Sequence, residues 1–169
     1  KKEVFHPAAA KLSGRTREKT GLAFKGSFLR CGIAGWCLEI LFTSVEAWMR
    51  GDPKLMGTTS IIMFPIYGAG ALLPLIVKWC DRWLSGLPGF EKADADKMPL
   101  AALKLRHGLI CMVLIYTGEY IAGTFLMGKG ICPWDYSQWP DHIGGVIRLA
   151  FIPFWFGTGL LFESLCTHK

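Results

Sequence analysis

The chain has 169 residues, of which 51% are hydrophobic, and its formal net charge at pH 7 is +6. This apolar fraction, together with seven Trp residues, exceeds what a soluble domain of this size carries, so the composition predicts a membrane protein. The Lys and Arg residues flank the apolar stretches, so their excess indicates membrane topology and argues against nucleic-acid binding.

The first segment, residues 1–26, is polar and basic. Its first 25 residues hold seven Lys or Arg against two Glu, without the apolar core of a cleavable signal peptide. We expect this segment to be a surface tail, either a short interfacial helix at anionic lipid or a disordered, solvated tail. Residues 27–169 would then form the membrane domain.

Four apolar stretches follow the tail, each close to the roughly 20 residues that span the hydrocarbon of a bilayer. We place them at residues 27–48, 59–80, 102–126 and 143–162. Each must be a helix, because a spanning segment has to satisfy its own backbone hydrogen bonds. The predicted fold is therefore an all-α membrane protein, a bundle of four transmembrane helices. The number of residues from Glu39 to the start of the next span is similar to the number from Glu119 to the start of the span after it. This similarity also suggests two parallel helical hairpin repeats.

Proline is expected to disturb two of these helices. Pro65 and Pro74 fall in the second stretch and Pro153 falls in the fourth. Proline inside a helix removes one backbone hydrogen bond and bends the axis. We therefore predict kinks in the second and fourth spans.

Basic residues predict the orientation. The N-terminal segment with Arg30, the connection after the second span and the C-terminus hold fifteen Lys or Arg, and the two other connections hold three. The positive-inside rule places both termini on the cytoplasmic side or its organellar equivalent. The identity of the membrane stays open.

A short aromatic loop, residues 132–140, follows the third span and carries two prolines and one carboxylate. Trp134, Tyr136 and Trp139 have rings that favour the headgroup level of a bilayer. We expect Trp134, Tyr136 and Ser137 to form a fixed cap over the helix ends. Asp135 should accept hydrogen bonds from loop amides or pair with Arg148.

Carboxylates inside the spans are the strongest functional signal. A carboxylate in mid-span costs about 2.5 to 3.5 kcal/mol on insertion scales, so Glu39 and Glu119 should face the bundle interior. Tyr67 falls at their depth, and Arg148 enters the fourth span from the side of the aromatic loop. We predict one pocket lined by these four residues, with Asp135 nearby, as a binding site. The alternative is a structural ion pair of Arg148 with either glutamate.

The other ionisable residues are weaker indicators of function than Glu39 and Glu119. Glu46 and Glu163 lie near span ends, where they are expected to reach water. The four His residues fall in or beside loops and tails, and there is no Cys-x-x-Cys, so we expect no metal site, haem or other cofactor. Cys80 and Cys166 could meet at the inner helix ends.

Four short motifs, which follow one another along the chain, carry a family resemblance. They are Gly35-Trp36-Cys37-Leu38-Glu39, Phe64-Pro65-Ile66-Tyr67-Gly68, Gly118-Glu119-Tyr120 and Cys132-Pro133-Trp134-Asp135-Tyr136-Ser137-Gln138. Together they resemble the family that includes animal transmembrane protein 229 and bacterial ABC-transporter type IV proteins of the CmpB type. The resemblance implies a small multi-pass membrane protein without an established biochemical role. It also implies that seven residues occupy family motif positions: Glu39, Tyr67, Glu119, Trp134, Asp135, Tyr136 and Ser137.

Three classes of function remain open. A transport protein would use Glu39 and Glu119 as sites for a small-molecule substrate, ion or proton. A structural or assembly subunit of a larger membrane complex would use the same polar groups as a helix clamp or lipid seat. A membrane enzyme could use Asp135 and Glu119 as acid and base on lipid headgroups, but neither a nucleophile motif nor a metal site accompanies them. The expected partners are membrane lipids and either further copies of the chain or other membrane subunits.

Overall fold

The computed structural model describes residues 7–86 and 98–167, and their side chains from residue 23 onward. The first and second spans are formed by α1 (Pro7–Met49) and by α2 (Met63–Gly68), η1 (Ala69–Leu72) and α3 (Leu73–Ser85). The third is α4 (Leu100–Gly128). Two short strands, β1 (His142–Ile143) and β2 (Ile147–Arg148), precede η4 (Leu149–Phe151) and α5 (Ile152–Thr167).

Within the described residues, four segments are long and apolar enough to cross a membrane. They are Ala23–Met49, Met63–Ser85, Leu100–Gly128 and Leu149–Thr167. The predicted all-α bundle of four spans is therefore confirmed. The fourth span begins at residue 149 rather than 143, because β1 and β2 pair as a small antiparallel ribbon before the helix starts. Gly144 and Gly145 turn this ribbon with positive φ angles of 61° and 73°, which glycine adopts without strain.

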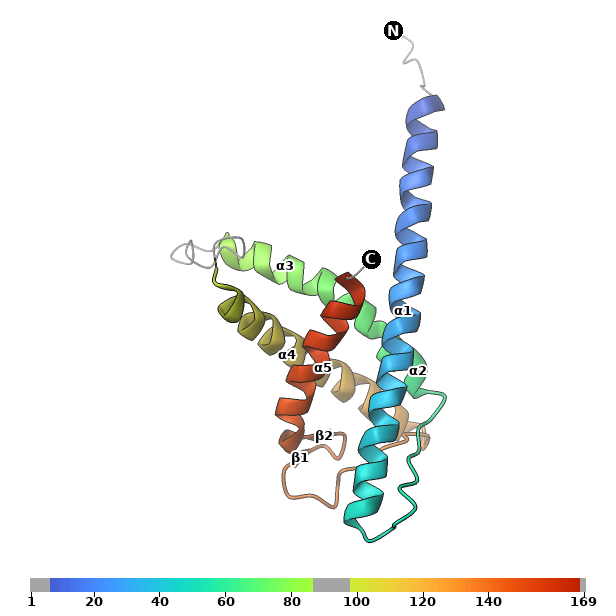
Figure 1. The fold of residues 1–169 in the computed structure, drawn as a ribbon, viewed down its shortest axis with the longest axis vertical. Helices are drawn as coiled ribbons and strands as arrows, with labels where there is room; N and C mark the ends of the chain where they lie inside the picture. Colours follow the sequence, from blue (N-terminus) through green and yellow to red (C-terminus); the bar gives the residue numbers. More distant parts are fainter. Residues whose placement is uncertain (1–6, 87–97, 168–169) are drawn as a thin grey trace.

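The N-terminal segment is continuous with the first span. Helix α1 begins at Pro7 and runs through residue 26 without a break. Its 43 residues correspond to about 65 Å at 1.5 Å per residue. Figure 1 shows the N-terminal part of α1 extending past the other helices. Of the two conformations expected for the tail, the backbone from Pro7 is helical, and residues 1–6 lie outside the described part.

The second span is interrupted, as the prolines predicted. The 3₁₀ turn η1 separates α2 from α3, and Pro74 lies in the first turn of α3. Proline has no backbone N–H for the carbonyl of residue 70, and the N–H of Leu73 donates to that carbonyl instead. Pro153 has the same setting in the fourth span, directly after the 3₁₀ turn η4. That residue lies in the first turn of α5, where a helix needs no donor.

The helices meet around a small core. Its buried members are Cys31, Ala71, Leu73, Val77, Cys111 and Phe162, from α1, η1, α3, α4 and α5. Glycine permits the close contacts around it: a Cβ on Gly70 would overlap the Phe162 ring, and one on Gly35 would overlap Tyr67. The contact with Gly35 presses Tyr67 of α2 onto α1.

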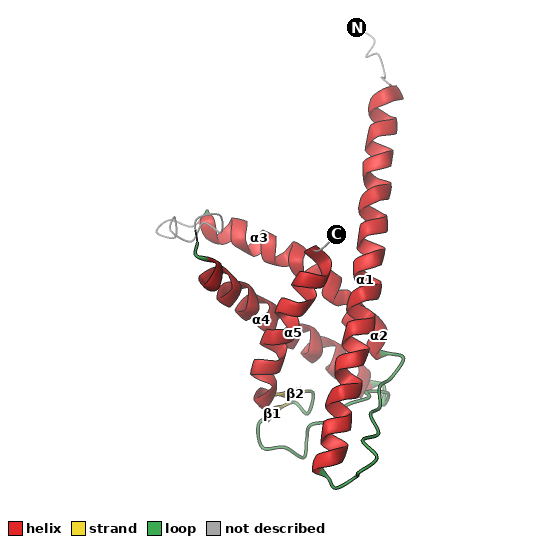
Figure 2. Cartoon of the chain, viewed as in Figure 1, coloured by secondary structure: helices red, strands yellow, loops and turns green. Residues whose placement is uncertain are grey.

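The connections 50–62 and 129–141 gather at one end of the bundle (Figure 2), which we call the loop side. The other end, where α3 ends, α4 begins and α5 ends, is the terminal side. Helices α3 and α4 slant away from α1 toward that side, and α5 packs between α4 and α1 (Figure 1).

Candidate functional site

The aromatic loop is held in place by backbone hydrogen bonds. The indole Nε1 of Trp134 donates to the carbonyl of Val146 at 3.0 Å, and the N–H of Tyr136 donates to the carbonyl of Gly145 at 2.7 Å. The carboxylate of Asp135 accepts from the N–H of Ser137 at 2.9 Å. Hydrogen bonds from the Ser137 side chain and backbone hold the pKa of Asp135 below its usual range. Of the two kinds of partner expected for Asp135, the loop amide is the one present.

Arg148 is placed differently from the expectation. Its guanidinium stacks over the Trp139 ring at 3.7 Å from the ring centre, and its Nε lies 3.5 Å from a carboxylate oxygen of Asp141. It forms no ion pair with Glu39 or Glu119 and is not among the described residues that line the pocket below. The reason is that Arg148 belongs to β2 and precedes the helix, so its side chain is directed over the loop.

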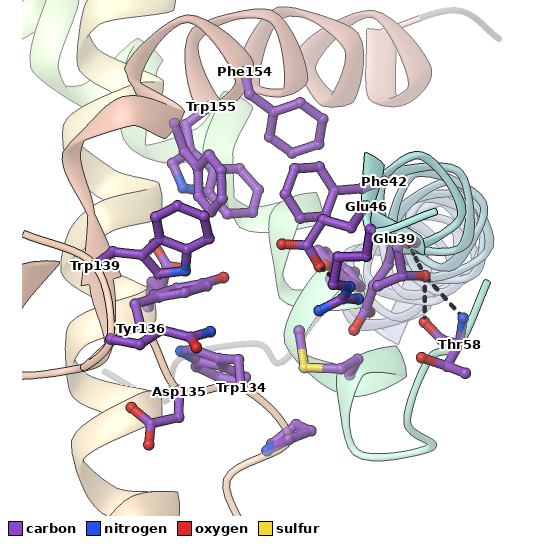
Figure 3. A pocket seen from close by; sticks show the side chains of 18 of the residues that line it. Glu39, Phe42, Glu46, Thr58, Trp134, Asp135, Tyr136, Trp139, Phe154 and Trp155 are labelled. Carbon is purple, nitrogen blue, oxygen red and sulfur yellow. Dashed lines mark hydrogen bonds and ion pairs between the residues drawn. The ribbon is translucent and has the colours of Figure 1, made fainter. Parts of the chain in front are cut away.

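A cavity of about 440 Å³ lies on the loop side between α1, α2, α4, α5 and the aromatic loop (Figure 3). Glu39, Tyr67 and Glu119 all lie on its wall, each on a different helix. Trp134, Asp135 and Tyr136 of the predicted loop cap also line it, whereas Ser137 does not. Ser137 lies behind the wall, against Gly145.

On the α1 side of the cavity, hydroxyl groups contact the carboxylate of Glu39. Thr59 Oγ1 donates to Glu39 Oε2 at 2.8 Å, and the Tyr67 hydroxyl lies close to this carboxylate. The segment that carries Thr59 is fixed to α1, because the N–H of Thr58 donates to Thr43 Oγ1 at 2.8 Å and Trp36 Nε1 donates to the carbonyl of Ser60 at 3.0 Å. Glu39 therefore has neutral partners only among the described residues.

On the opposite wall, two buried polar atoms lack a partner. Glu119 Oε2 of α4 and Trp155 Nε1 of α5 are both buried without a hydrogen bond among the described residues. The two side chains lie close together, but not in the geometry of a hydrogen bond. An acceptor and a donor are thus left at the same place on the cavity wall.

The wall is acidic and aromatic. Among the described residues that line it, four have carboxylates and one, Arg50, is basic. Arg50 lies 3.6 Å from Glu46, four residues earlier on α1, and its side chain is exposed. Glu46 was expected to reach water, and its side chain is 33% exposed. Eight aromatic residues complete the wall: Phe42, Tyr67, Trp134, Tyr136, Trp139, Phe151, Phe154 and Trp155.

Several of these rings were not predicted as site residues. Phe42 contacts Phe151 and Phe154 at ring-centre distances of 5.0 and 5.9 Å, which joins α1 to α5 beside the cavity (Figure 3). The available signal was helical spacing, because Phe42 lies three residues after Glu39, and Phe151 and Trp155 lie four apart. The resulting site is suited to a cation, which both carboxylates and aromatic faces attract.

Sequence comparison assigns the chain to a family. The sequence model of the family described as "Putative ABC-transporter type IV" matches residues 27–168. The chain belongs to this family. The predicted resemblance to CmpB-type proteins is thereby confirmed, and the protein is an integral membrane protein of a transporter-type family. The match includes every residue named on the cavity wall and leaves out residues 1–26. No solved structure matches the chain.

A second polar cluster lies on the terminal side. Two of its residues, His107 and Glu163, are placed differently from what the sequence predicted. His107 was placed in or beside a loop and Glu163 near water, but they are only 9% and 8% exposed. His107 Nδ1 lies 2.6 Å from Glu163, and His107 Nε2 lies 3.0 Å from Asp81. Arg106 contacts Asp81 at 2.5 Å, and Lys104 contacts Glu163 at 3.4 Å.

This cluster links three helices, α3, α4 and α5, and its acids have basic partners. The described residues contain no group of three or more His, Cys, Asp or Glu arranged to hold a metal ion. The predicted meeting of Cys80 with Cys166 is wrong. Cys166 Sγ instead lies 3.6 Å from Cys31 Sγ as a free thiol, because α5 packs against α1 at that level.

Proposed function

We propose that this protein is a transport component that binds a small organic cation in the loop-side cavity. Glu39 and Glu119 balance the charge of the ligand, and the aromatic rings surround it. The observation that carries the proposal is the placement of these two carboxylates, from α1 and α4, on one cavity wall with eight aromatic residues. Membership of a transporter-type family supports the same class of function.

Electrostatics favours a cationic ligand over a neutral one. A carboxylate inside a membrane protein is costly unless a cation or strong donors compensate it. Glu39 has hydroxyl partners, and Glu119 Oε2 has none among the described residues. A bound cation would compensate both carboxylates and gain about 0.5 to 2 kcal/mol from each well-placed ring. The cavity volume of about 440 Å³ also falls within the usual range for small-molecule sites.

Transport needs access from both membrane sides, and four spans make a small pathway. The proposal therefore includes assembly with further copies of the chain or with other membrane subunits.

The positive-inside count supports a loop side that faces away from the cytoplasm. A maleimide that does not cross membranes should label Gln138→Cys in intact cells, with the unsubstituted chain as control. Labelling of Gln138→Cys only after the membrane is opened would reverse this orientation.

Binding tests the proposal directly. Tetramethylammonium should bind the purified protein in lipid nanodiscs, as measured by titration calorimetry. Glu39→Gln and Glu119→Gln should each weaken the affinity at least about tenfold, because each removes a charge–charge interaction of about 1.4 kcal/mol or more. Asp52→Asn is the matched control, since this carboxylate lies on the loop side but not on the cavity wall. Unchanged affinity in the double Gln variant would refute the cation site.

A role as a complex subunit is the second candidate, and the shape of α1 favours it. This helix extends beyond the bundle (Figure 1), and its sequence from residue 7 to residue 25 contains five Lys or Arg. Such a projecting basic helix is suited to an acidic partner surface or anionic lipid. Removal of residues 1–22 should then dissociate any larger complex that purifies with the protein, while tetramethylammonium still binds. An unchanged complex would exclude this role for the helix.

A further inference from the structure

A second cavity lies directly beside the first. Its volume is about 220 Å³, and it lies further toward the terminal side, between α2, η1 and α3 on one wall and α4 and α5 on the other. Four residues, Met63, Tyr67, Glu119 and Trp155, line both cavities. The two spaces are therefore adjacent, with these four side chains between them.

The two cavities differ in chemistry. Among the described residues that line only the second one, Thr158 has the single polar side chain, and the others are Gly, Ala, Leu, Ile or Phe. The first cavity has four carboxylates on its wall. An apolar cavity of roughly 150 Å³ already accepts benzene in a protein interior, so the second cavity is large enough for part of a hydrocarbon chain. The two adjacent spaces are thus polar at the loop side and apolar beyond it.

The junction carries a donor without a partner. Trp155 is 8% exposed, lines both cavities, and its Nε1 has no hydrogen bond among the described residues. A buried indole N–H is normally bonded, because leaving it unsatisfied is costly. This atom is closed off as the ring stands, so a rotation of the indole toward the junction would be needed for a ligand oxygen to accept this bond. The structure therefore indicates three consecutive ligand features: a cationic end, an oxygen and an apolar chain.

We propose that the ligand is a single-chain amphiphile with a cationic head, such as a long-chain quaternary ammonium compound or amine. Its head occupies the loop-side cavity, its chain occupies the second cavity, and an oxygen between them accepts from Trp155 Nε1. This inference rests on the proposed function and adds the substrate class. A phosphate-bearing head is excluded by the four carboxylates on the wall of the first cavity. The bilayer itself supplies molecules with such chains.

The chain offers a matched pair of variants that separate the two cavities. A Cβ on Gly118 of α4 would meet nothing within 4 Å, and Gly118 lines only the second cavity. Gly118→Leu should therefore place an isobutyl group at this wall without a clash at its Cβ, which narrows the cavity. Gly157 of α5 also has open space at its Cβ but lines neither cavity, so Gly157→Leu is the control.

The test is a chain-length series of alkyltrimethylammonium ions, from tetramethylammonium to the octyl compound, titrated into protein nanodiscs with empty nanodiscs subtracted. Each methylene moved from water into an apolar site contributes roughly fourfold at most, so the octyl compound should bind at least about tenfold tighter than tetramethylammonium. Gly118→Leu should abolish this gain and leave tetramethylammonium affinity unchanged. Gly157→Leu should behave like the unsubstituted protein, which removes membrane partitioning from the comparison.

The junction has its own probe. Octanoylcholine carries an ester oxygen near its cationic head, and Trp155→Phe should weaken its binding about fivefold through the lost hydrogen bond. The same variant should leave the affinity for octyltrimethylammonium within about twofold of the original. Equal losses for both compounds would overturn the proposed hydrogen bond at the junction.

The outcomes distinguish the two proposals. Binding of tetramethylammonium without a chain-length gain, or a gain that survives Gly118→Leu, overturns the amphiphile and leaves the cation site intact. Binding of neutral octyl glucoside as tightly as octyltrimethylammonium, unaffected by Glu39→Gln with Glu119→Gln, overturns the cationic head. Absence of binding by every cation in the series refutes the proposed function and the inference together.

Discussion

The loop-side cavity and the terminal-side cluster contain the same kind of residue in opposite situations. In the terminal-side cluster, Asp81 contacts Arg106 and His107, and Glu163 contacts His107 and Lys104, at distances of 2.5 to 3.4 Å. On the loop side, Glu39 accepts a hydrogen bond from the Thr59 hydroxyl and has no ion pair among the described residues, and one oxygen of Glu119 has no partner among them. The first set of acids is neutralised by the chain, and the second is not.

This difference separates a structural role from a binding role. A buried charge cluster in which each acid touches a base fixes the relative positions of its helices, and breaking one contact leaves an uncompensated charge. Carboxylates around an open cavity hold no helices together and leave their charge for a ligand. Four predictions follow from the contrast, each of which could break it.

The largest effect on stability is expected for Glu163→Gln in the terminal-side cluster. The substitution leaves His107 and Lys104 without their carboxylate partner inside the bundle, which should cost about 3 kcal/mol. Thermal unfolding in detergent should show a decrease of several degrees in the melting temperature. His107→Leu should lower it comparably, because Asp81 and Glu163 then lose their shared partner. A melting temperature within about one degree of the original would contradict the structural role.

Glu119→Gln should change stability much less. Its carboxylate has no charged partner among the described contacts, so an amide of the same shape should leave the free energy of unfolding within about 1 kcal/mol or raise it slightly. The same melting experiment, run beside Glu163→Gln without any cation present, measures the difference. Equal destabilisation by the two variants would remove the distinction between the two regions.

The aromatic loop should show an intermediate effect. Trp134→Phe keeps the ring but removes the indole donor to the carbonyl of Val146, which should cost about 1 kcal/mol. Hydrogen exchange of the amides around Val146 should accelerate, while exchange in α3 stays unchanged. Trp48→Phe is the control, because Trp48 is 63% exposed and none of the described hydrogen bonds uses its indole. Unchanged exchange at Val146 would show that the loop is held by other contacts.

The smallest effect concerns pH. The N–H of Ala150 donates to Asp141 at 2.8 Å, and this bond, with Arg148 nearby, holds the pKa of Asp141 below its usual range. A carboxylate with a lowered pKa stabilises the fold above its unfolded pKa, near 4, and this contribution is lost as pH falls through the folded value. Melting temperatures measured from pH 6 to pH 3 should therefore fall slightly more for the original chain than for Asp141→Asn. Parallel curves would contradict the linkage.

Part of the candidate site could be predicted because the depth of a residue in the membrane follows from its position within its own apolar stretch. Glu39, Tyr67 and Glu119 each fall near the middle of an apolar stretch, and such groups avoid lipid. Their common depth on three helices was enough to predict one shared wall. Arg148 escaped prediction because its helix was assumed to begin at residue 143, whereas the ribbon of β1 and β2 delays it to residue 152. A shift of that size changes the direction of every side chain in between.

The sequence by itself determined the number of spans, the all-α class and the family, because hydropathy, span length and short motifs are read along the chain. Only the tertiary structure decided which charges meet. His107 and Glu163 are separated by 56 positions and touch at 2.6 Å, while Glu119 Oε2 has no hydrogen-bond partner among the described residues. Such pairings depend on the rotation and slant of each helix. Close packing at glycine residues sets both, for example where the Phe162 ring packs against Gly70. A rotation of α4 by one residue, about 100°, would separate His107 from Glu163.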